Sequence, residues 1–333
     1  MKGISIQHTS NQALLQLQEY EAPTPKASEV LVRWHATSLN YHDFLVAKGL
    51  IPVEAGRIPM SDGAGEILAV GEGVSQWKAG DKVMSLFFPN WLDGKPSLKK
   101  TRAISGETVN GYACEASCVP ADALTRIPAG YSFAEAATLP CAALTAWRAL
   151  FVEGGLKAGD NVLIEGSGGM SIFALQLAKA AGAKVYATTS SEAKAERLKA
   201  MGASAVVNYR TDERWGKTLS KMSGGIDHVL DVGGGSTMRQ SIEAAAVGGN
   251  IIAIGILGNG RKGEITFPKL FFKHLRMIGI AVGSRKMQED MVKALEVSQL
   301  RPIIDKSFPL EKLSEAFDYQ ASGQHFGKIV VEW

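Results

Sequence analysis

Hydrophobic and polar positions between residues 160 and 209 alternate between two periods, one typical of buried strands and the other of helices. Three short apolar runs have the length of buried parallel strands, and two helical segments separate them. In chain order these are a strand at 161–165, a helix ending at Gly182, a strand at 183–188, a helix at 192–201 and a strand at 205–209. This pattern predicts half of a doubly wound parallel α/β sheet.

Apolar runs farther along the chain extend this sheet. Residues 227–232 and 249–255 are typical of further buried strands, and residues 275–282 of the last one. Residues 287–298 have the pattern of an amphipathic helix. Residues 303–309 and 328–332 return to the strand pattern, and we expect this tail to rejoin the N-terminal domain and make it discontinuous.

The first 125 residues are rich in strand signals separated by Gly and Pro turns. Such runs include 1–9, 29–36, 65–70 and 109–121, the last as a strand pair, with a long polar loop at 89–107. Many short strands of this kind predict a partly open β barrel. Beyond them, Ser132 and Glu135 form a capping-box pattern at the start of a helical stretch, which we expect Pro140 to interrupt.

Composition is that of an ordinary globular protein. At 333 residues the chain exceeds what one hydrophobic core usually holds, so we expect two domains. The net charge of +3 is too small to favour a nucleic acid as partner. We find no apolar run of membrane-spanning length and no signal peptide, and the three cysteines imply no disulfide framework. We therefore expect a cytoplasmic protein.

A glycine-rich turn follows the first strand of the α/β pattern. Gly166, Gly168 and Ser171 stand at the spacing G-x-G-x-x-G between a strand and a helix, which is the context that this motif requires. The N–H groups and the dipole of a helix N-terminus favour a pyrophosphate there. We therefore predict a dinucleotide site formed by Gly166, Ser167, Gly168, Gly169, Met170 and Ser171. Ser171 replaces the third glycine, so we expect a slightly wider spacing between helix and strand.

The residues after the second and third strands favour NADPH over NADH. An NAD site generally has Asp or Glu roughly 20 residues past the glycine turn. At that place this chain has Thr189, Ser190, Ser191 and Lys194. Hydroxyls and an ammonium suit a 2′-phosphate, and Tyr209 and Arg210 can add a hydroxyl and a guanidinium. The alternative is that Ser190 and Ser191 only cap the following helix.

Phrases along the whole chain resemble one enzyme family. SLNYHDFLVAKG, PMSDGAGEILAVGEGV, WKAGDKV, EAATLPCAALTAWRAL, GSGGMSIFALQLAKAAGAKV, GASAVVNYR and HFGKIVV occur in the order found in medium-chain dehydrogenases/reductases, with the zinc-independent quinone oxidoreductase branch most similar. The resemblance implies a GroES-like catalytic domain at 1–125 and 282–333 and a Rossmann domain at 126–281 with strand order 3-2-1-4-5-6. It also implies a cofactor in the cleft between the domains and a homodimer.

The resemblance further implies a site without a metal. Zinc-dependent relatives hold the catalytic zinc with Cys, His and Cys, and this chain has Asn40, Ser61 and Cys141 at those positions. Asp62 and Cys141 alone do not complete a tetrahedral site. The structural zinc loop of those relatives needs four cysteines, and only Cys114 and Cys118 occur in that region, which we interpret as small buried residues.

Catalytic candidates lie in the segment from Asn40 to Asp43, which the resemblance places at the cleft floor. Two roles are open for each of the first three of these residues. Asn40 either donates a hydrogen bond to a developing oxyanion or only holds a turn, and Tyr41 either donates a proton or forms an aromatic wall of the site. His42 either relays protons near neutral pH or faces solvent. For Asp43 we expect a structural ion pair. Thr145 contacts the nicotinamide or caps a kink after Pro140. Relatives hold the ribose and nicotinamide where this chain has Gly233, Gly255, Ile256, Leu257, Ala281, Val282, Phe326 and Lys328.

These observations predict an oxidoreductase that transfers a hydride from NADPH to a small-molecule quinone, enone or aldehyde without a metal. A zinc-free alcohol dehydrogenase running the same chemistry in reverse is the nearest alternative. A nucleotide-binding protein with little turnover, including an RNA-binding one, is a more distant alternative. Its only basic candidate surface is the short stretch Lys95–Arg102.

Overall fold

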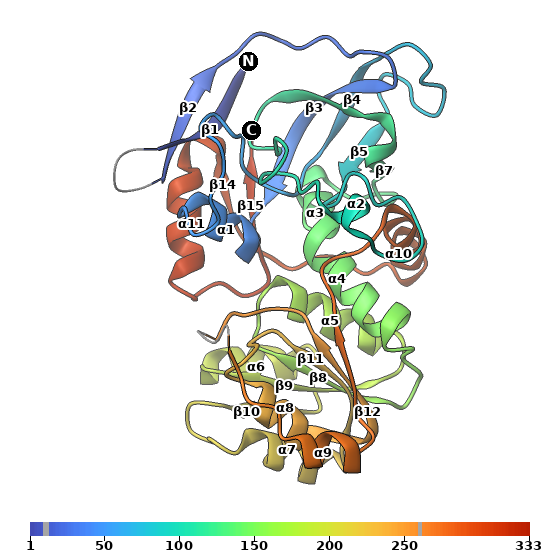
Figure 1. The fold of residues 1–333 in the computed structure, drawn as a ribbon, viewed down its shortest axis with the longest axis vertical. Coiled ribbons are helices and arrows are strands. Elements are labelled where there is room, and N and C mark those ends of the chain that lie inside the picture. Colours follow the sequence, from blue (N-terminus) through green and yellow to red (C-terminus); the bar gives the residue numbers. More distant parts are fainter. Residues whose placement is uncertain (9–12, 259–261) are drawn as a thin grey trace. The chain divides into compact units, whose positions relative to one another are not determined.

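The computed structural model describes residues 1–8, 13–258 and 262–333, which form two compact units (Figure 1). The first unit combines Met1–Leu144 with Val282–Trp333, and the second is Thr145–Ala281. Residues 126–144, assigned above to the dinucleotide-binding domain, lie in the first unit. The reason is that helix α3 (Phe133–Ala137) packs there on strands β3 (Glu29–Ser38) and β4 (Ala64–Val70).

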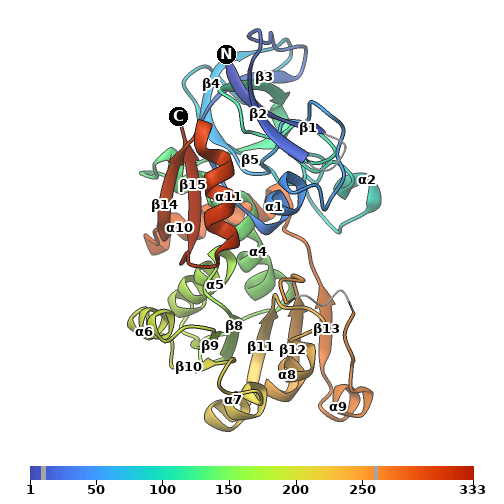
Figure 2. The ribbon, with the colours of Figure 1, turned by 90° about the vertical axis from the view of Figure 1, so that its left-hand side faces the viewer.

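The second unit contains a six-stranded sheet with helices packed on it (Figure 2). Its order, β10-β9-β8-β11-β12-β13, is the 3-2-1-4-5-6 order of a Rossmann fold, and every neighbouring pair is parallel. The strands are β8 (Asn161–Glu165), β9 (Lys184–Thr189), β10 (Ala205–Asn208), β11 (Ile226–Asp231), β12 (Ala245–Ala253) and β13 (Arg276–Gly279). The helices are α5 (Gly169–Ala180), α6 (Glu192–Ala200), α7 (Trp215–Ser223), α8 (Met238–Ala244) and α9 (Phe267–Phe272).

The first unit is built on a mainly antiparallel β structure. A seven-stranded sheet of order β14-β15-β3-β4-β5-β7, with β6 also pairing with β3, lies in the same unit as the two-stranded sheet β1-β2. The remaining strands are β1 (Lys2–His8), β2 (Ala13–Glu19), β5 (Lys82–Ser85), β6 (Ala116–Pro120), β7 (Leu124–Arg126), β14 (Ile304–Pro309) and β15 (Lys328–Glu332). The C-terminal pair β14–β15 is parallel, and β15 joins β3 antiparallel, which is how the tail rejoins this unit.

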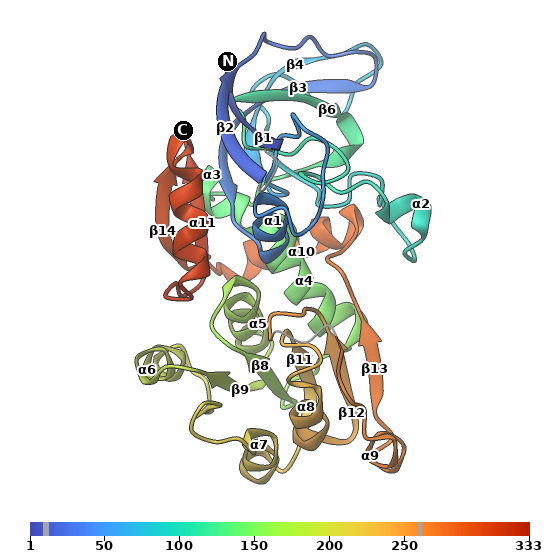
Figure 3. The ribbon, with the colours of Figure 1, turned by 60° about the vertical axis from the view of Figure 1, so that its left-hand side comes forward.

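The helices of the first unit range from four to 14 residues in length. They are α1 (Tyr41–Ala47), α2 (Leu98–Thr101), α3, α10 (Arg285–Ser298) and α11 (Leu313–Ala321), which lies beside β14 and β15 (Figure 3). Ser132 caps α3 and Glu135 completes the capping box, as predicted. Pro140 does not end the helical stretch, because it stands in the first turn of a π-helical segment (Leu139–Ala143), where a missing N–H is tolerated. The stretch continues through α4 (Leu144–Trp147) and a second π segment (Arg148–Glu153).

Two predictions for the N-terminal region are wrong. The segment 109–121 contains one strand, β6, and not a pair, because the backbone of residues 111–113 bonds to residues 58–60 instead. Gly111 permits this approach, since a Cβ there would lie 2.1 Å from Met60 O. The segment 89–107 is not simply a polar loop: it contains α2 and the fully buried Trp91, whose Nε1 donates to Gly94 O at 2.9 Å.

Each unit has its own hydrophobic core. Residues of β8, β11, β12, α7 and α8 form one core in the second unit, and β3, β4 and the C-terminal elements contribute to two clusters in the first. Within the described ranges, no helix is long and apolar enough to span a membrane.

Candidate functional site

The glycine turn lies between β8 and α5, as predicted. Gly166 has a φ of +75°, a conformation that glycine adopts without strain. A Cβ added at Gly166 or Gly168 would meet no atom within 4 Å, so the space beside the turn is open. Gly168 is the N-cap of α5 and has no side chain to compete with a ligand for the first N–H groups of the helix. The turn therefore has the form of an anion-binding helix start, with Ser167 before the helix and Gly169 and Met170 in its first turn.

Ser171, at the third glycine position, is accommodated by a hydrogen bond. Its buried hydroxyl donates to Glu165 O at 2.7 Å, from the first turn of α5 to the end of β8. The contact between helix and strand is therefore polar here, and the predicted wider spacing stays a prediction.

The residues proposed to select NADPH lie at the adjacent ends of β9 and β10. Asn208 stands opposite Thr189, and Tyr209 N donates to Thr189 O at 3.0 Å, which places Arg210 next to this edge. Ser191 caps α6 by accepting from Lys194 N at 3.5 Å, so the capping alternative holds for that residue. Glu192, which the sequence analysis did not weigh, places a carboxylate nearby, where its Oε1 accepts from Asn208 Nδ2.

The loops after β11 and β12 are bonded to each other. Leu257 N donates to Val232 O at 2.9 Å, and Gly258 N donates to Gly233 O at 3.1 Å. These bonds bring Gly233, Gly255, Ile256 and Leu257 together at the carboxyl ends of two neighbouring strands. The side chains of Ile256 and Leu257 are exposed, as a ligand-contacting position requires.

The chain leaves the second unit through Ala281 and Val282. Ala281 O accepts from Arg148 Nη1 at 3.2 Å, which fixes the end of this segment. Val282 has a φ of +46°, which is strained for a β-branched residue. Such strain persists only where the neighbouring structure imposes it, so the surrounding structure fixes the backbone conformation of Val282.

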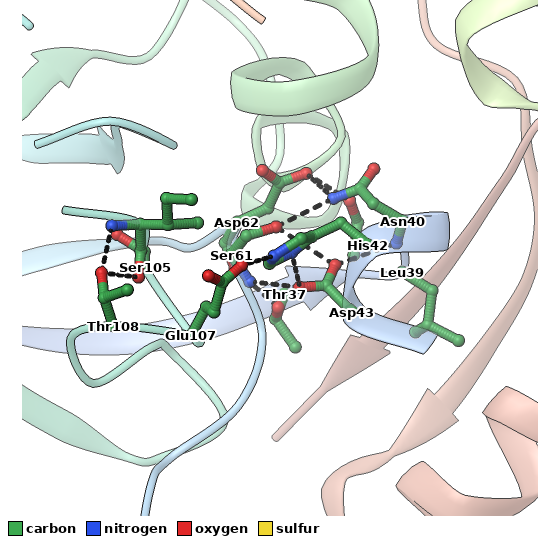
Figure 4. Close-up of polar contacts among 12 residues, drawn as sticks. Thr37, Leu39, Asn40, His42, Asp43, Ser61, Asp62, Ser105, Glu107 and Thr108 are labelled. Atoms are coloured by element: carbon green, nitrogen blue, oxygen red, sulfur yellow. Dashed lines mark hydrogen bonds and ion pairs between the residues drawn. The ribbon is translucent and has the colours of Figure 1, made fainter. Parts of the chain in front are cut away.

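Asn40 lies at the start of α1 in a buried polar cluster of the first unit (Figure 4). Its Nδ2 donates to Asp62 Oδ2 at 2.8 Å and to Ser61 Oγ at 3.3 Å. Its Oδ1 accepts from Lys328 Nζ at 2.6 Å. Both amide hydrogens therefore have protein acceptors, and Asn40 holds this cluster together instead of offering a donor to an oxyanion.

Lys328 points into the same cluster. Its Nζ donates to Leu39 O and Asn40 Oδ1, both at 2.6 Å, and lies 4.0 Å from Asp62 Oδ2. The residue is only 3% exposed. Burial lowers the pKa of Lys328, and the neighbouring Asp62 opposes that effect. We therefore reassign Lys328 from the cofactor residues to this cluster, because its ammonium end is used there.

Asp62 is completely buried beside Lys328. Its Oδ2 accepts from Asn40 Nδ2 and from Ser38 Oγ at 3.0 Å, whereas the buried Oδ1 has no hydrogen-bond partner among the described residues. Burial raises the pKa of Asp62 to about 7, although Lys328 opposes the rise. Two donors thus stabilise negative charge on Oδ2, and Oδ1 is where a proton binds near neutral pH.

A zinc ion does not fit this cluster. The family resemblance implies that Asn40 and Ser61 stand at two of the three ligand positions of zinc-dependent relatives, and their amide and hydroxyl groups are poor zinc ligands. The buried ammonium of Lys328 bonds to Asn40 itself, so a divalent cation would sit beside a positive charge in a region of low dielectric. No set of three His, Cys, Asp or Glu side chains in the described residues is arranged to hold a metal.

His42 is tied to a loop of the same unit. Its Nε2 lies 2.7 Å from Glu107 Oε2, and its ring packs edge-on against Phe87. Burial would lower the pKa of His42, but the carboxylates of Asp43 and Glu107 outweigh it and raise the pKa to about 9. Because Nδ1 lies 3.7 Å from Asp43 Oδ1, Glu107 is the closer partner. An imidazolium that keeps its proton across neutral pH does not relay protons there in the predicted way.

The remaining candidate residues lie in different environments. Tyr41 is 38% exposed and stacks on Phe44, which is compatible with either predicted role. Asp43 accepts from Asn40 N and Ser61 N and lies 3.7 Å from His42 Nδ1, so it makes structural hydrogen bonds as well as the predicted ion pair. Phe326 is buried in the first unit, and Thr145 is buried at the start of the second.

Sequence reasoning missed three pairs of side chains: His42 with Glu107, Lys328 with Asp62, and Glu165 with Asp231, which both bond to Ser241. Glu107 gave no signal, because it stands in an irregular loop far from His42 in the chain. The contact of Lys328 with Asp62 joins distant segments and equally had no local signature. Glu165 and Asp231 did give one: each is a carboxylate at the end of a buried apolar strand, where charge is costly without a partner.

Comparisons with known proteins find dehydrogenase families that match residues in both units. The family described as "Alcohol dehydrogenase GroES-like domain" matches residues 26–129, and "Zinc-binding dehydrogenase" matches residues 169–298. The chain is 42% identical over 328 residues to a zinc-type alcohol dehydrogenase-like protein of Schizosaccharomyces pombe, covering 96% of this chain and 95% of that protein.

Two solved structures extend the similarity to the fold. A putative alcohol dehydrogenase from Sinorhizobium meliloti 1021 superposes with a TM-score of 0.93 at 37% identity, covering 100% of this chain and 98% of that one. An NAD-dependent alcohol dehydrogenase superposes with a TM-score of 0.90 at 31% identity, covering 100% of both chains.

Proposed function

The chain belongs to the medium-chain dehydrogenase/reductase family of NAD(P)-dependent oxidoreductases, and we propose that it is a metal-independent member that transfers a hydride from NADPH to an aldehyde, enone or quinone. The observation that carries the metal-independent part is the buried Lys328 ammonium bonded to Asn40. A protein cation stands there beside Asn40, which the resemblance places at a ligand position of zinc-dependent relatives. An alcohol dehydrogenase working in the opposite direction uses the same groups.

The cofactor supplies the hydride when it is bound, and the protein supplies binding, orientation and a proton. The open glycine turn and the uncapped start of α5 suit the pyrophosphate, and the bonded loops after β11 and β12 suit the ribose and nicotinamide. For the proton, Tyr41 is exposed and close in the chain to the Asn40 cluster. Asp62 Oδ1 is a further candidate, since it binds a proton near neutral pH.

We propose NADPH as the preferred cofactor. The end of β9 has Thr189 and Ser190 where an NAD site generally has a carboxylate, and Arg210 stands beside them. Glu192 and the cap made by Ser191 work against a 2′-phosphate, and one similar solved structure bears the name NAD-dependent. The preference we expect is therefore modest.

We also propose that the protein is a homodimer that associates through one edge of the Rossmann sheet. Strand β13 ends the sheet, and its outer edge pairs with no other strand of the described residues. The adjoining α9 exposes three aromatic side chains, Phe267 at 68%, Phe271 at 59% and Phe272 at 73%. Such a patch beside an open strand edge is typical of a protein interface. Light scattering of a Phe271→Ser, Phe272→Ser double variant should give a monomer, and an unchanged mass would refute this assignment.

The activity is tested by oxidation of NADPH in the presence of quinones, enones and aldehydes, with alcohols and NADP⁺ for the reverse direction. We expect turnover with at least one of the first three classes at a kcat of about 1 s⁻¹ or more. The Tyr41→Phe variant should lower kcat by roughly 100-fold if the phenol is the proton donor. Tight binding of NADPH with no turnover of any class would instead support the nucleotide-binding alternative.

A further inference from the structure

Two buried carboxylates meet at the centre of the Rossmann sheet. Glu165 ends β8 and Asp231 ends β11, and these strands are neighbours. In the order 3-2-1-4-5-6 they are strands one and four, between which the chain reverses direction across the sheet. Ligands of doubly wound proteins bind in the crevice at this switch point. The carboxylate pair therefore lies beneath the place where the cofactor binds.

The hydroxyl of Ser241 on α8 joins the two carboxylates. Its Oγ lies 2.6 Å from Asp231 Oδ2 and 3.0 Å from Glu165 Oε1. A serine hydroxyl has one hydrogen and can donate it to only one of these oxygens. At the other contact, two oxygens lie within hydrogen-bond distance and one of them must contribute a hydrogen. A proton on one carboxyl group supplies it, since that group then donates to Ser241 Oγ.

The remaining oxygens of the pair hold the turn after β11. Glu165 Oε2 accepts from Val232 N at 3.0 Å and from Gly233 N at 3.1 Å, and Asp231 Oδ1 accepts from Gly234 N at 2.7 Å. Three successive backbone N–H groups are thus fixed by the pair. The carbonyls of residues 232 and 233 in turn accept from residues 257 and 258. The pair therefore sets the position of both loops that we assign to the ribose and nicotinamide.

We propose that Glu165 and Asp231 hold one proton between them through Ser241, and that this proton positions the cofactor-binding turn. This inference rests on the proposed function for the role of the turn, whereas the shared proton itself does not depend on it. With the proton present, the pair carries one negative charge and all its bonds are satisfied. When the proton is lost, two buried carboxylates repel each other and the Ser241 bridge loses a hydrogen.

The electrostatic surroundings favour the protonated pair. Burial, and then the charge of Asp231, raises the pKa of Glu165, and burial also raises the pKa of Asp231. Thr237 Oγ1 donates to Asp231 from α8. The other charged groups on neighbouring elements have their own partners or are exposed. His228 bonds to Asp160, Asp227 accepts from Asn161 N, and Glu243 pairs with Lys269. Lys184 stands at the opposite end of β9, and the exposed groups are Lys179 on α5, Lys217 and Lys221 on α7, and Arg239 on α8.

The shared proton is tested by infrared spectroscopy of the cofactor-free protein near pH 7. The measurement uses an Asp62→Asn background, which removes the other carboxyl group that binds a proton near pH 7. In that background the protein should show a protonated carboxyl C=O band that Glu165→Gln removes. Glu196→Gln, which changes an exposed carboxylate on α6, is the matched control and should leave the band in place. A band that survives Glu165→Gln, or no band at all, would overturn the shared proton.

The positioning role is tested by the Kd of NADPH between about pH 6 and pH 10, measured by fluorescence. If the bound state keeps the proton, Kd should rise by up to about tenfold for each pH unit above the pKa of the pair. Glu165→Gln, with a neutral amide in its place, should abolish this rise. If that variant does not fold, Ser241→Ala should instead move the rise to lower pH, because the proton is held less tightly. Equal pH profiles in wild type and the folded variant refute the role. Failure of NADPH to bind at any pH would refute the proposed function, and the infrared result would still decide the shared proton.

Discussion

The two units bury a carboxylate in different ways. In the first unit Asp62 lies beside the ammonium of Lys328, which a distant part of the chain supplies. In the second unit Glu165 lies beside another carboxylate, and a proton is the available means of neutralising the charge. Both solutions avoid an uncompensated buried charge. They differ in their response to pH and mutation, since an amine is part of the fold whereas a proton exchanges with solvent.

Removing the ammonium should have the largest effect on stability. Lys328→Met leaves Asp62 buried without its cation, and we expect the free energy of unfolding to fall by about 2–3 kcal/mol. The value is at the lower end for a buried pair, because Asp62 can take up a proton instead. Urea unfolding near pH 7 measures it.

The matched control is the double variant Lys328→Met, Asp62→Asn, which removes both charges. It should recover part of the loss, because no unpaired charge remains. Additive losses in the double variant would show that the two groups do not interact.

The charged contact of His42 with Glu107 should make stability depend on pH in a further way. The folded-state pKa of about 9 exceeds the ordinary 6.5, so the contact stabilises fully below pH 6.5 and is lost as the pH rises through about 9. The rise from 6.5 to about 9 corresponds to at most about 3 kcal/mol, and partial exposure of both side chains reduces it. Relative to His42→Gln, wild type should therefore lose about 2 kcal/mol of stability between about pH 6 and pH 10. A constant difference between the two proteins over this range would contradict the assignment of His42 as an imidazolium.

Cofactor preference should be a smaller effect. One charge-assisted hydrogen bond to a 2′-phosphate, weakened by solvent and by Glu192, favours NADPH by about tenfold in kcat/KM. Arg210→Ala should bring the ratio for NADPH over NADH close to one, and Glu192→Gln should raise it. A wild-type ratio that favours NADH would defeat the proposal.

The smallest change should come from replacing the protonated acid of the second unit by its neutral analogue. At neutral pH, Glu165→Gln should cost about 1 kcal/mol or less, because the amide keeps an acceptor for the turn and a donor for Ser241. A loss as large as that of Lys328→Met would show that Glu165 is charged, and the contrast between the two sites would disappear.

Local sequence patterns were sufficient for the strands and the glycine turn of the Rossmann unit, whereas they did not predict its helices α7, α8 and α9. Its strands are continuous apolar runs, Gly166 marks the turn, and the strand order follows from the family resemblance. The β unit was harder to predict from local patterns. Residues 111–113 bond to a loop, and the helical stretch continues through Pro140.

The chemistry of the site depended on contacts that no local pattern contains. Lys328 reaches Asn40 only because β15 joins β3, and Glu107 reaches His42 from an irregular loop. The family resemblance identified Asn40 and Lys328 as candidates, but the pairing of their side chains changed the role of both.

The central claim is that Lys328 stands in place of a metal, and the most direct measurement is the zinc content of protein produced with added zinc, together with its activity in chelator. We predict far less than one zinc per chain and unchanged turnover after chelation. About one zinc per chain, whose removal abolishes turnover and whose return restores it, would contradict the account.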